Sequence, residues 1–312
     1  MRRSMRILFT MAVAFGAAAA LAADEPKPAF STELVFPLNA EHNHAPAIVE
    51  CPNGDLLASW YRGSGGRTAD DVRVLGARMR KGDKRWGSEF LMVDTPGFPD
   101  CNTAMFIDNK ERLWLFWPVI IANTWESAIT NYVTSTDYQG EGAPKWEWKD
   151  QIYLKPENFK DAFLDHVNHR LGNKQPLSKK QLGVLQLAKD TAGDKMYQRF
   201  GWMPRCKPTV LKSGRILMPL YTDTYSFSIM AVSDDEGKTW YASQPIIDYG
   251  NIQPTVLQRD EGTVVAYMRE NGFQDYIRIS ESTDDGITWS PVKNSVLPNP
   301  GSGLDGVRLK NG

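Results

Sequence analysis

Short apolar segments separated by turn residues follow one another along most of the chain. His44–Val49 and Leu56–Trp60 are expected to form two strands on either side of an Asn-Gly-Asp turn. Asn102–Ile107 and Arg112–Trp117 repeat that arrangement. Apolar and aromatic segments of this length, bounded by Gly, Asn and Asp, are typical of strands joined by tight turns. The pattern therefore predicts an all-β fold.

These strands belong to a repeating unit. The octapeptide Ser233–Trp240 returns as Ser282–Trp289, and both read S-x-D-x-G-x-T-W with their tryptophans 49 residues apart. Upstream, Lys207–Leu211 returns as Gln253–Leu257 after 46 residues. A period of 40 to 50 residues filled by short strands is typical of the blades of a β-propeller.

Each residue of the octapeptide has a structural role in a turn between two strands. The Asp carboxylate is expected to bind backbone N–H groups of its own loop, and the Ser and Thr hydroxyls close that loop. The Trp ring would pack into the edge of the neighbouring blade. We therefore regard these positions as structural and not catalytic: Ser233, Asp235, Gly237, Trp240, Ser282, Asp284, Gly286 and Trp289.

Five units can be recognised, which open near His44, Asn102, Arg205, Asn251 and Gly303. The fifth runs only to Gly312, so we expect a six-bladed propeller over residues 30–312 that is incomplete from blade five onward. Strand-like residues 32–36 would close the ring as an outer strand. Apolar residues at helical spacing between 156 and 200 predict a helical insertion between blades two and three, which we expect to form a wall or lid of the site.

The first 22 residues form a signal peptide by their pattern. Three arginines precede the apolar stretch Ile7–Ala19, and Ala20-Leu21-Ala22 supplies a small-residue cleavage site. This stretch is too short to span a membrane, and no later one qualifies. We therefore expect an exported protein, periplasmic or secreted.

Composition narrows the possible partners. Lys and Arg number 36 against 37 Asp and Glu, so the chain has no charge footprint for nucleic acid. The three cysteines are too few for a disulfide scaffold, although one pair among Cys51, Cys101 and Cys206 stays possible. No phosphate-binding loop, serine-hydrolase elbow or zinc-protease helix occurs, so we expect no cofactor and no metal. The sequence does not indicate an oligomeric state.

The two octapeptides, with the segments His44–Ala58 and Asn299–Leu309, resemble the Asp-box or BNR repeats of bacterial sialidase-like proteins. The resemblance covers nearly all of the chain after residue 22 except the helical insertion. It implies a six-bladed propeller that hydrolyses a terminal anionic sugar of glycans. Sialidases bind the sugar carboxylate with three arginines, protonate the leaving oxygen with an Asp, and use a Tyr nucleophile that a Glu activates, unlike most glycosidases.

Residue by residue, the resemblance carries over only in part. His44 stands where the first arginine is expected, and Arg269 matches the second. Arg62 matches a further arginine of the site, and Asp71, with Asp70 as the near alternative, matches the acid, whose pKa would be raised. The activating Glu should lie near Asn251–Gln253, where no carboxylate occurs. The remaining arginine and the tyrosine would lie beyond the sequence given.

Further candidates follow from their positions in the repeat. Inner strands line the central channel of a propeller, so Arg205, Lys207 and Asp305 join Arg62 and Arg269 as candidate ligands of an anionic sugar. His44 would face the pocket as an acid or base, and we expect His42 to point to the opposite face. The alternatives to a sialidase-like hydrolase are a uronic-acid-directed hydrolase or lyase that uses His44, and a glycan-binding propeller without activity.

Overall fold

The computed structural model describes residues 32–172 and 178–309. The chain divides into a short unit, Met1–Leu34, and a large unit, Val35–Gly312, and the description below concerns the large unit. The predicted signal peptide, residues 1–22, lies outside the described residues.

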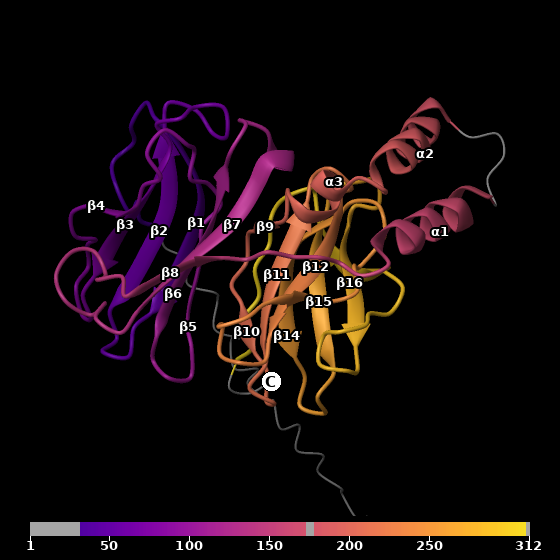
Figure 1. The fold of residues 1–312 in the computed structure, drawn as a ribbon. Helices are drawn as coiled ribbons and strands as arrows, with labels where there is room; N and C mark the ends of the chain where they lie inside the picture. Colours follow the sequence, from indigo (N-terminus) through magenta and orange to yellow (C-terminus); the bar gives the residue numbers. More distant parts are fainter. Residues whose placement is uncertain (1–31, 173–177, 310–312) are drawn as a thin grey trace, which may run out of the picture. The chain divides into compact units, whose positions relative to one another are not determined.

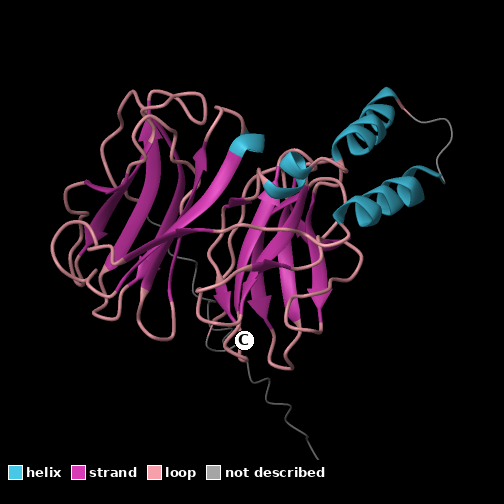
Figure 2. Cartoon of the chain, in the orientation of Figure 1, coloured by secondary structure: helices cyan, strands magenta, loops and turns pink. Residues whose placement is uncertain are grey.

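Four antiparallel sheets of the kind expected for propeller blades make up this unit (Figures 1 and 2). Each sheet contains a four-stranded meander in which successive strands pair, as tight turns favour, and one sheet has a fifth, two-residue strand beside its meander. Blade one contains β1 (His42–Glu50), β2 (Leu56–Gly63), β3 (Arg73–Met79) and β4 (Phe90–Val93), and blade two contains β5 (Ala104–Ile107), β6 (Leu113–Ile120), β7 (Ala128–Ser135) and β8 (Trp148–Gln151). Blade three contains β9 (Met203–Pro204), β10 (Thr209–Val210), β11 (Ile216–Thr222), β12 (Phe227–Ser233) and β13 (Tyr241–Ala242), and blade four contains β14 (Asn251–Gln258), β15 (Val264–Glu270), β16 (Tyr276–Ser282) and β17 (Lys293–Pro298).

The two octapeptides fold into the same turn, between β12 and β13 in blade three and between β16 and β17 in blade four. Asp235 accepts hydrogen bonds at Oδ1 from Ser233 Oγ (2.9 Å) and Thr239 N (2.9 Å), and at Oδ2 from Thr239 Oγ1 (2.6 Å). The backbone N–H of Gly237 donates to Ser233 Oγ at 2.8 Å. The second turn makes the same four bonds with Ser282, Asp284, Gly286 and Thr288. These carboxylates therefore hold the fold, as the sequence predicts.

Each octapeptide also contacts the preceding blade. The Trp240 ring of blade three meets Phe116 and Tyr132 of blade two edge-on, with ring centroids 6.2 and 6.0 Å apart. Gly237 has a φ of +85°, and a β-carbon there would lie 2.3 Å from the Trp114 ring. Only glycine satisfies both conditions. In blade four, Trp289 packs against the core of blade three, so the interfaces between blades form the hydrophobic core.

Three helices, α1 (Phe159–Gly172), α2 (Lys179–Thr191) and α3 (Lys195–Arg199), lie in the interval for which the sequence predicts an insertion (Figure 1). On α1, Phe159 and Phe163 bury their rings against Tyr225, between β11 and β12, at 5.2 and 4.8 Å. The His166 imidazole of the same helix lies 3.7 Å from Asp248, ahead of β14. The insertion thus packs on blades three and four, and its role as a lid stays a prediction.

Two strand predictions are wrong within the described residues. Residues 32–36 form no strand, and Phe36 instead stacks on Trp60 at 4.6 Å. The predicted first strand of unit five, Gly303–Leu309, also pairs with no strand. This segment runs beside the inner strands of blades three and four, where Cys206 Sγ meets Leu304 O at 3.0 Å.

The three cysteines are free and buried, so the disulfide that the sequence left open does not form. No described helix is long and apolar enough to cross a membrane.

Candidate functional site

Residues from different blades meet where the inner strands begin and the second strands end. At this end β1 and β14 each contain a bulge at the same repeat position, marked by Ala45 (φ 53°) and Gln253 (φ 51°). A bulge adds one residue to a strand and re-aims the side chains beside it. The strict alternation assumed from the sequence therefore fails at the site.

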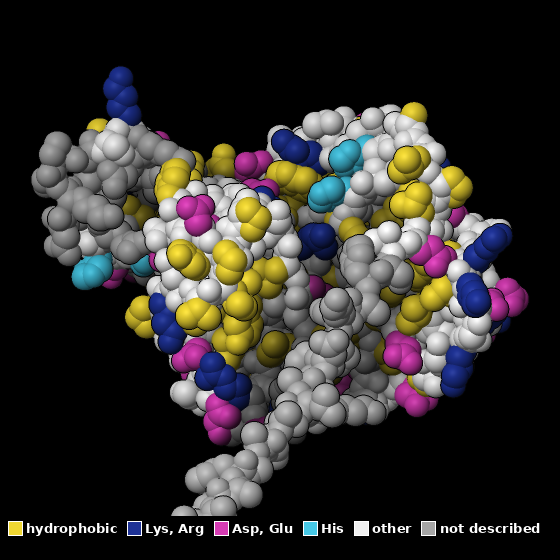
Figure 3. All heavy atoms as spheres, turned by 180° about the vertical axis from the view of Figure 1, so that it is seen from behind, with side chains coloured by type: hydrophobic (Ala, Val, Ile, Leu, Met, Phe, Trp, Pro, Cys, Tyr) yellow, Lys and Arg dark blue, Asp and Glu magenta, His cyan; other side chains and the backbone are white. Residues whose placement is uncertain are grey.

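A cluster of aromatic and imidazole rings lies on the side of the site that belongs to blade one. His42 and His44 stack with ring centroids 5.8 Å apart, and each lies 5.6 Å from Tyr61 on β2. The Nε2 atom of His42 lies 3.4 Å from the Tyr61 hydroxyl. Our expectation that the two histidines point to opposite faces is wrong, because residues two apart on a strand share a face. In space-filling view, histidine and basic side chains lie close together beside a hollow (Figure 3).

Two arginines act electrostatically on His44. Burial lowers the pKa of His44, and the positive charges of Arg205 and Arg269 lower it further, so the site favours the neutral imidazole. The Arg205 guanidinium reaches Pro46 O at 3.5 Å, and Arg269 Nη1 donates to Gln253 Oε1 at 3.4 Å. Arg269 Nε is buried and has no hydrogen-bond partner among the described residues. This nitrogen is out of contact with solvent, so a ligand would meet Arg269 at the end of its guanidinium group.

A buried tyrosine that we did not consider from the sequence lies beneath these groups. The Tyr221 hydroxyl, at the end of β11, accepts hydrogen bonds from Asn102 Nδ2 (3.0 Å) and Gln253 Nε2 (3.4 Å), and its burial raises its pKa. Gln253 stands in the region where the family resemblance places an activating Glu. Because a carboxamide does not take up a proton at neutral pH, Gln253 cannot serve as that base.

Asp223 was also missed. It directly follows β11, at the same end of its blade as Arg269 on β15, and this location was the sequence signal that could have suggested it. Burial raises the pKa of Asp223, while the charges of Arg269 and Arg67 oppose that rise. Arg67 lies in the β2–β3 loop with its guanidinium 5.1 Å from the Trp125 ring. A half-buried carboxyl with a raised pKa beside arginines suits proton donation.

Arg62 does not join the site. Its guanidinium binds both carboxylate oxygens of Glu89 at 2.6 and 2.7 Å and covers the Phe36 ring at 4.5 Å. Arg62 faces away from Tyr61, its neighbour on β2, because successive side chains alternate across a strand. The match to a sugar-binding arginine is therefore corrected: in this structure Arg62 is a buried ion-pair residue.

Asp71 closes its own loop. Its carboxylate accepts hydrogen bonds from the backbone N–H and hydroxyl of Ser64 at 3.1 and 2.9 Å, and these bonds lower its pKa. The raised pKa that we expected for Asp71 is thus wrong, since the carboxyl is exposed and bonded as an anion. The alternative, Asp70, accepts a hydrogen bond from Asn123 at 2.9 Å, which ties the β2–β3 loop to the β6–β7 loop.

Lys207 and Asp305 bind each other. The Lys207 ammonium lies 3.2 Å from Asp305 Oδ1, and Asp305 also accepts a hydrogen bond from Thr255 at 2.8 Å. The pair therefore holds the segment after residue 302 to the inner strands. Their expected role as sugar ligands stays a prediction.

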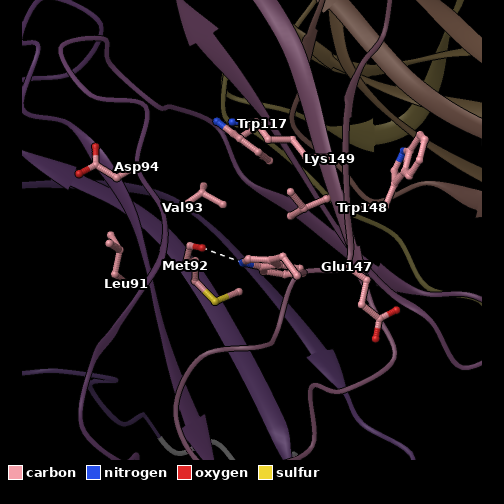
Figure 4. Close-up of a pocket in the computed structure, with 10 residues that line it drawn as sticks. Leu91, Met92, Val93, Asp94, Trp117, Glu147, Trp148 and Lys149 are labelled. Atoms are coloured by element: carbon pink, nitrogen blue, oxygen red, sulfur yellow. Dashed lines mark hydrogen bonds between the residues drawn. The ribbon is translucent and has the colours of Figure 1, made fainter.

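A second hollow, of about 400 Å³, lies between β4 and β8 at the outer side of blades one and two (Figure 4). Two of the three indole N–H groups that line it donate to acceptors inside the protein. Trp146 donates to Met92 O at 2.8 Å, and Trp117 donates to Asp100 at 2.7 Å. The described residues contain no group of three or more potential metal ligands. We therefore place the candidate site at Arg205 and Arg269, beside His44.

Comparisons with known proteins agree with this fold. Residues 198–312 match the family model of the BNR repeat-like domain. A protein of unknown function from Dyadobacter fermentans superposes with a TM-score of 0.62 at 16% identity, over 87% of this chain and 73% of that one.

Sialidases are similar at lower identity. The NanB sialidase of Streptococcus pneumoniae gives a TM-score of 0.57 at 13% identity over 85% of this chain, and the sialidase of Trypanosoma rangeli gives 0.54 at 12% over 80%. The chain spans 54% of NanB and 38% of the trypanosomal enzyme. The chain thus contains a BNR repeat domain and has a sialidase-like propeller fold.

Proposed function

We propose that this protein binds a terminal acidic sugar of a glycan and hydrolyses its glycosidic bond. One observation carries the proposal: Arg205 and Arg269, from separate blades, both lie close enough to His44 for their charges to lower its pKa. Guanidinium groups bind a carboxylate through paired, charge-assisted hydrogen bonds. The sialidase-like fold supports a sugar as the bearer of that carboxylate.

In this proposal Asp223 is the proton donor to the leaving oxygen. Its raised pKa keeps part of the population protonated where an ordinary Asp is ionised. Asp71, the acid that the family resemblance implies, is the competing assignment. The two carboxyls are distinguished by variants that keep the shape of the side chain and remove its charge.

The test is hydrolysis of a fluorogenic sialoside by the wild-type protein and by Arg269→Ala, Asp223→Asn and Asp71→Asn. Arg259→Ala is the matched control, because Arg259 pairs with Glu281 at 2.9 Å on blade four, away from the site. We expect turnover in the wild type and the control, and a loss of at least about 100-fold for Arg269→Ala and Asp223→Asn. Loss in Asp71→Asn alone would reassign the acid, and no turnover by folded wild type refutes the sialosidase proposal.

A second candidate is β-elimination in a uronic-acid polymer, which the neutral His44 and the carboxamide at Gln253 favour. In that reaction a base removes the proton on the carbon next to the carboxylate, the bond to the leaving oxygen breaks, and a carbon–carbon double bond forms. His44 would take the proton while the arginines hold the carboxylate. Release of an unsaturated uronate, followed by ultraviolet absorbance, identifies this activity. Binding of acidic oligosaccharides without any turnover would instead identify a glycan-binding propeller.

We also propose that the protein is exported and that its four described blades belong to a six-bladed ring. The N-terminal pattern supports export, and the resemblance to sialidases supports the ring. N-terminal sequencing of the protein recovered outside the cytoplasm should give a mature chain that begins at Ala23. A mature chain that retains Met1 would contradict export through this signal.

A further inference from the structure

Two stacked aromatic rings, one half-buried and one exposed, lie at the same end of blade four as Arg269. Tyr249 lies just before β14 and Phe273 just after β15, and their rings are parallel within 17° with centroids 5.9 Å apart. Phe273 exposes 67% of its surface. Paired aromatic rings beside charged groups combine an apolar surface with polar contacts, as ligand-binding sites do.

The two loops that present this stack are locked to each other. The N–H of Asn271 donates to Gly250 O at 2.7 Å, and Gly250 has a φ of +86°. A β-carbon at Gly250 would lie 2.5 Å from the backbone nitrogen of Gly272. Only a glycine at position 250 allows this approach, so the position of the aromatic stack is fixed before any ligand arrives.

A buried ionic network supports the same loop. Glu270 accepts a hydrogen bond from the N–H of Gly272, and its other oxygen lies 3.9 Å from Arg278 Nε. Arg278 also donates to Asp248 at 2.6 Å, and all three charged side chains are at least 95% buried. Because burying charges costs free energy, such a network is more readily explained by the geometry that it fixes than by added stability.

The aromatic stack lies within reach of a glycan held at Arg269. Phe273 follows Arg269 by four residues, so their Cα atoms are at most about 14 Å apart even along an extended chain. A sugar ring presents C–H groups on one face, and these pack against aromatic rings as other apolar surfaces do. We propose that Tyr249 and Phe273 form a subsite for the sugar next to the acidic one, an inference that rests on the proposed function.

The experiment compares one acidic sugar with a longer glycan that contains it. Affinities for free sialic acid and for sialyllactose are measured for the wild type, Phe273→Ala and the control Tyr153→Ala, a tyrosine that is 70% exposed on blade two. For Phe273→Ala we expect a Kd or KM for sialyllactose that is about threefold to tenfold higher, with the sialic acid Kd changed less than about twofold. Glu270→Gln, which keeps the size of the side chain, should shift sialyllactose binding in the same direction.

The possible failures are distinguishable. If sialic acid binds and Phe273→Ala affects both ligands equally, or neither, the subsite is refuted while the proposed function stands. If the wild type binds neither ligand, the proposed function fails for this sugar and the subsite inference fails with it. A melting temperature for each variant separates unfolding from lost contacts. Equal loss in Tyr153→Ala would also overturn the assignment to Phe273.

Discussion

The glycine of the first octapeptide allows a sharp test of how blades pack. Gly237 and Gly214 lie in two turns of blade three and share a left-handed backbone, with φ values of +85° and +89°. They differ in their surroundings. A β-carbon at Gly237 would lie 2.3 Å from the Trp114 ring, whereas a β-carbon at Gly214 meets nothing within 4 Å. Alanine at each position therefore separates backbone strain from steric overlap.

The expected losses of unfolding free energy follow from backbone strain and from steric overlap. Placing an L-residue in the left-handed region costs about 1–2 kcal/mol, and both variants carry that cost. Gly237→Ala must also displace Trp114, whose side chain is 1% exposed and hydrogen-bonded to Asp108 at 2.9 Å. Overpacking of a buried site adds about 1–3 kcal/mol. We expect a loss of about 1–2 kcal/mol for Gly214→Ala and about 2–5 kcal/mol for Gly237→Ala.

Urea unfolding followed by tryptophan fluorescence measures both losses. The slope of the unfolding free energy against urea should be the same in both variants, so that the midpoints alone report stability. Equal destabilisation of the two variants would refute the argument that Gly237 is required by its contact with Trp114. A loss confined to Gly214→Ala would contradict the described turn geometry.

Three further predictions concern buried groups. Burial raises the pKa of Asp100 to about 6, so the stability that its protonated form provides is present at low pH and is lost as pH rises from about 4 through 6. Relative to Asp100→Asn, the free energy of unfolding of the wild type should fall by about 2 kcal/mol between pH 4 and 7, and a constant difference would contradict this. Arg62→Met should lower the free energy of unfolding by about 2–4 kcal/mol in denaturant melts, because Glu89 loses its ion-pair partner. The same variant should leave the affinity for acidic sugars unchanged. Weakened sugar binding by the folded variant would restore Arg62 to the site. Burial raises the pKa of Cys101 and Cys206 to about 12. A thiol reagent should therefore label the native protein slowly and reach all three cysteines only after unfolding. Rapid labelling of the native protein would contradict their burial.

The repeat made much of the fold predictable. The hydrogen bonds that form the octapeptide turn join residues of the octapeptide itself, so Ser233, Asp235 and Gly237 specify the same turn wherever the sequence recurs. Helical spacing of Phe159, Phe163 and Val167 likewise revealed α1, because these residues share one face. Such signals are local, which is why sequence alone reveals them.

The site was harder to predict because it is assembled from several blades. Whether Tyr61 or Arg62 faces the centre depends on a one-residue difference in strand phase, which the bulge at Ala45 obscures. Burial raises the pKa of Asp223, and the charges that modify this shift belong to Arg269, Glu126 and Arg67, which are distant in sequence. The family resemblance predicted Arg269 as a site residue and noted that Gln253 stands where a carboxylate is expected, yet it could not show that Asp71 is bonded to Ser64.

Each octapeptide turn fits the surface of the particular blade that precedes it. Gly237 is shaped for the flat ring of Trp114, whereas Gly286 meets the branched side chain of Leu217. The two turns have almost the same sequence, but the surfaces that receive them differ. Blades of this chain are therefore not interchangeable modules: a variant with two blades exchanged would keep every local turn and still mismatch where blades meet.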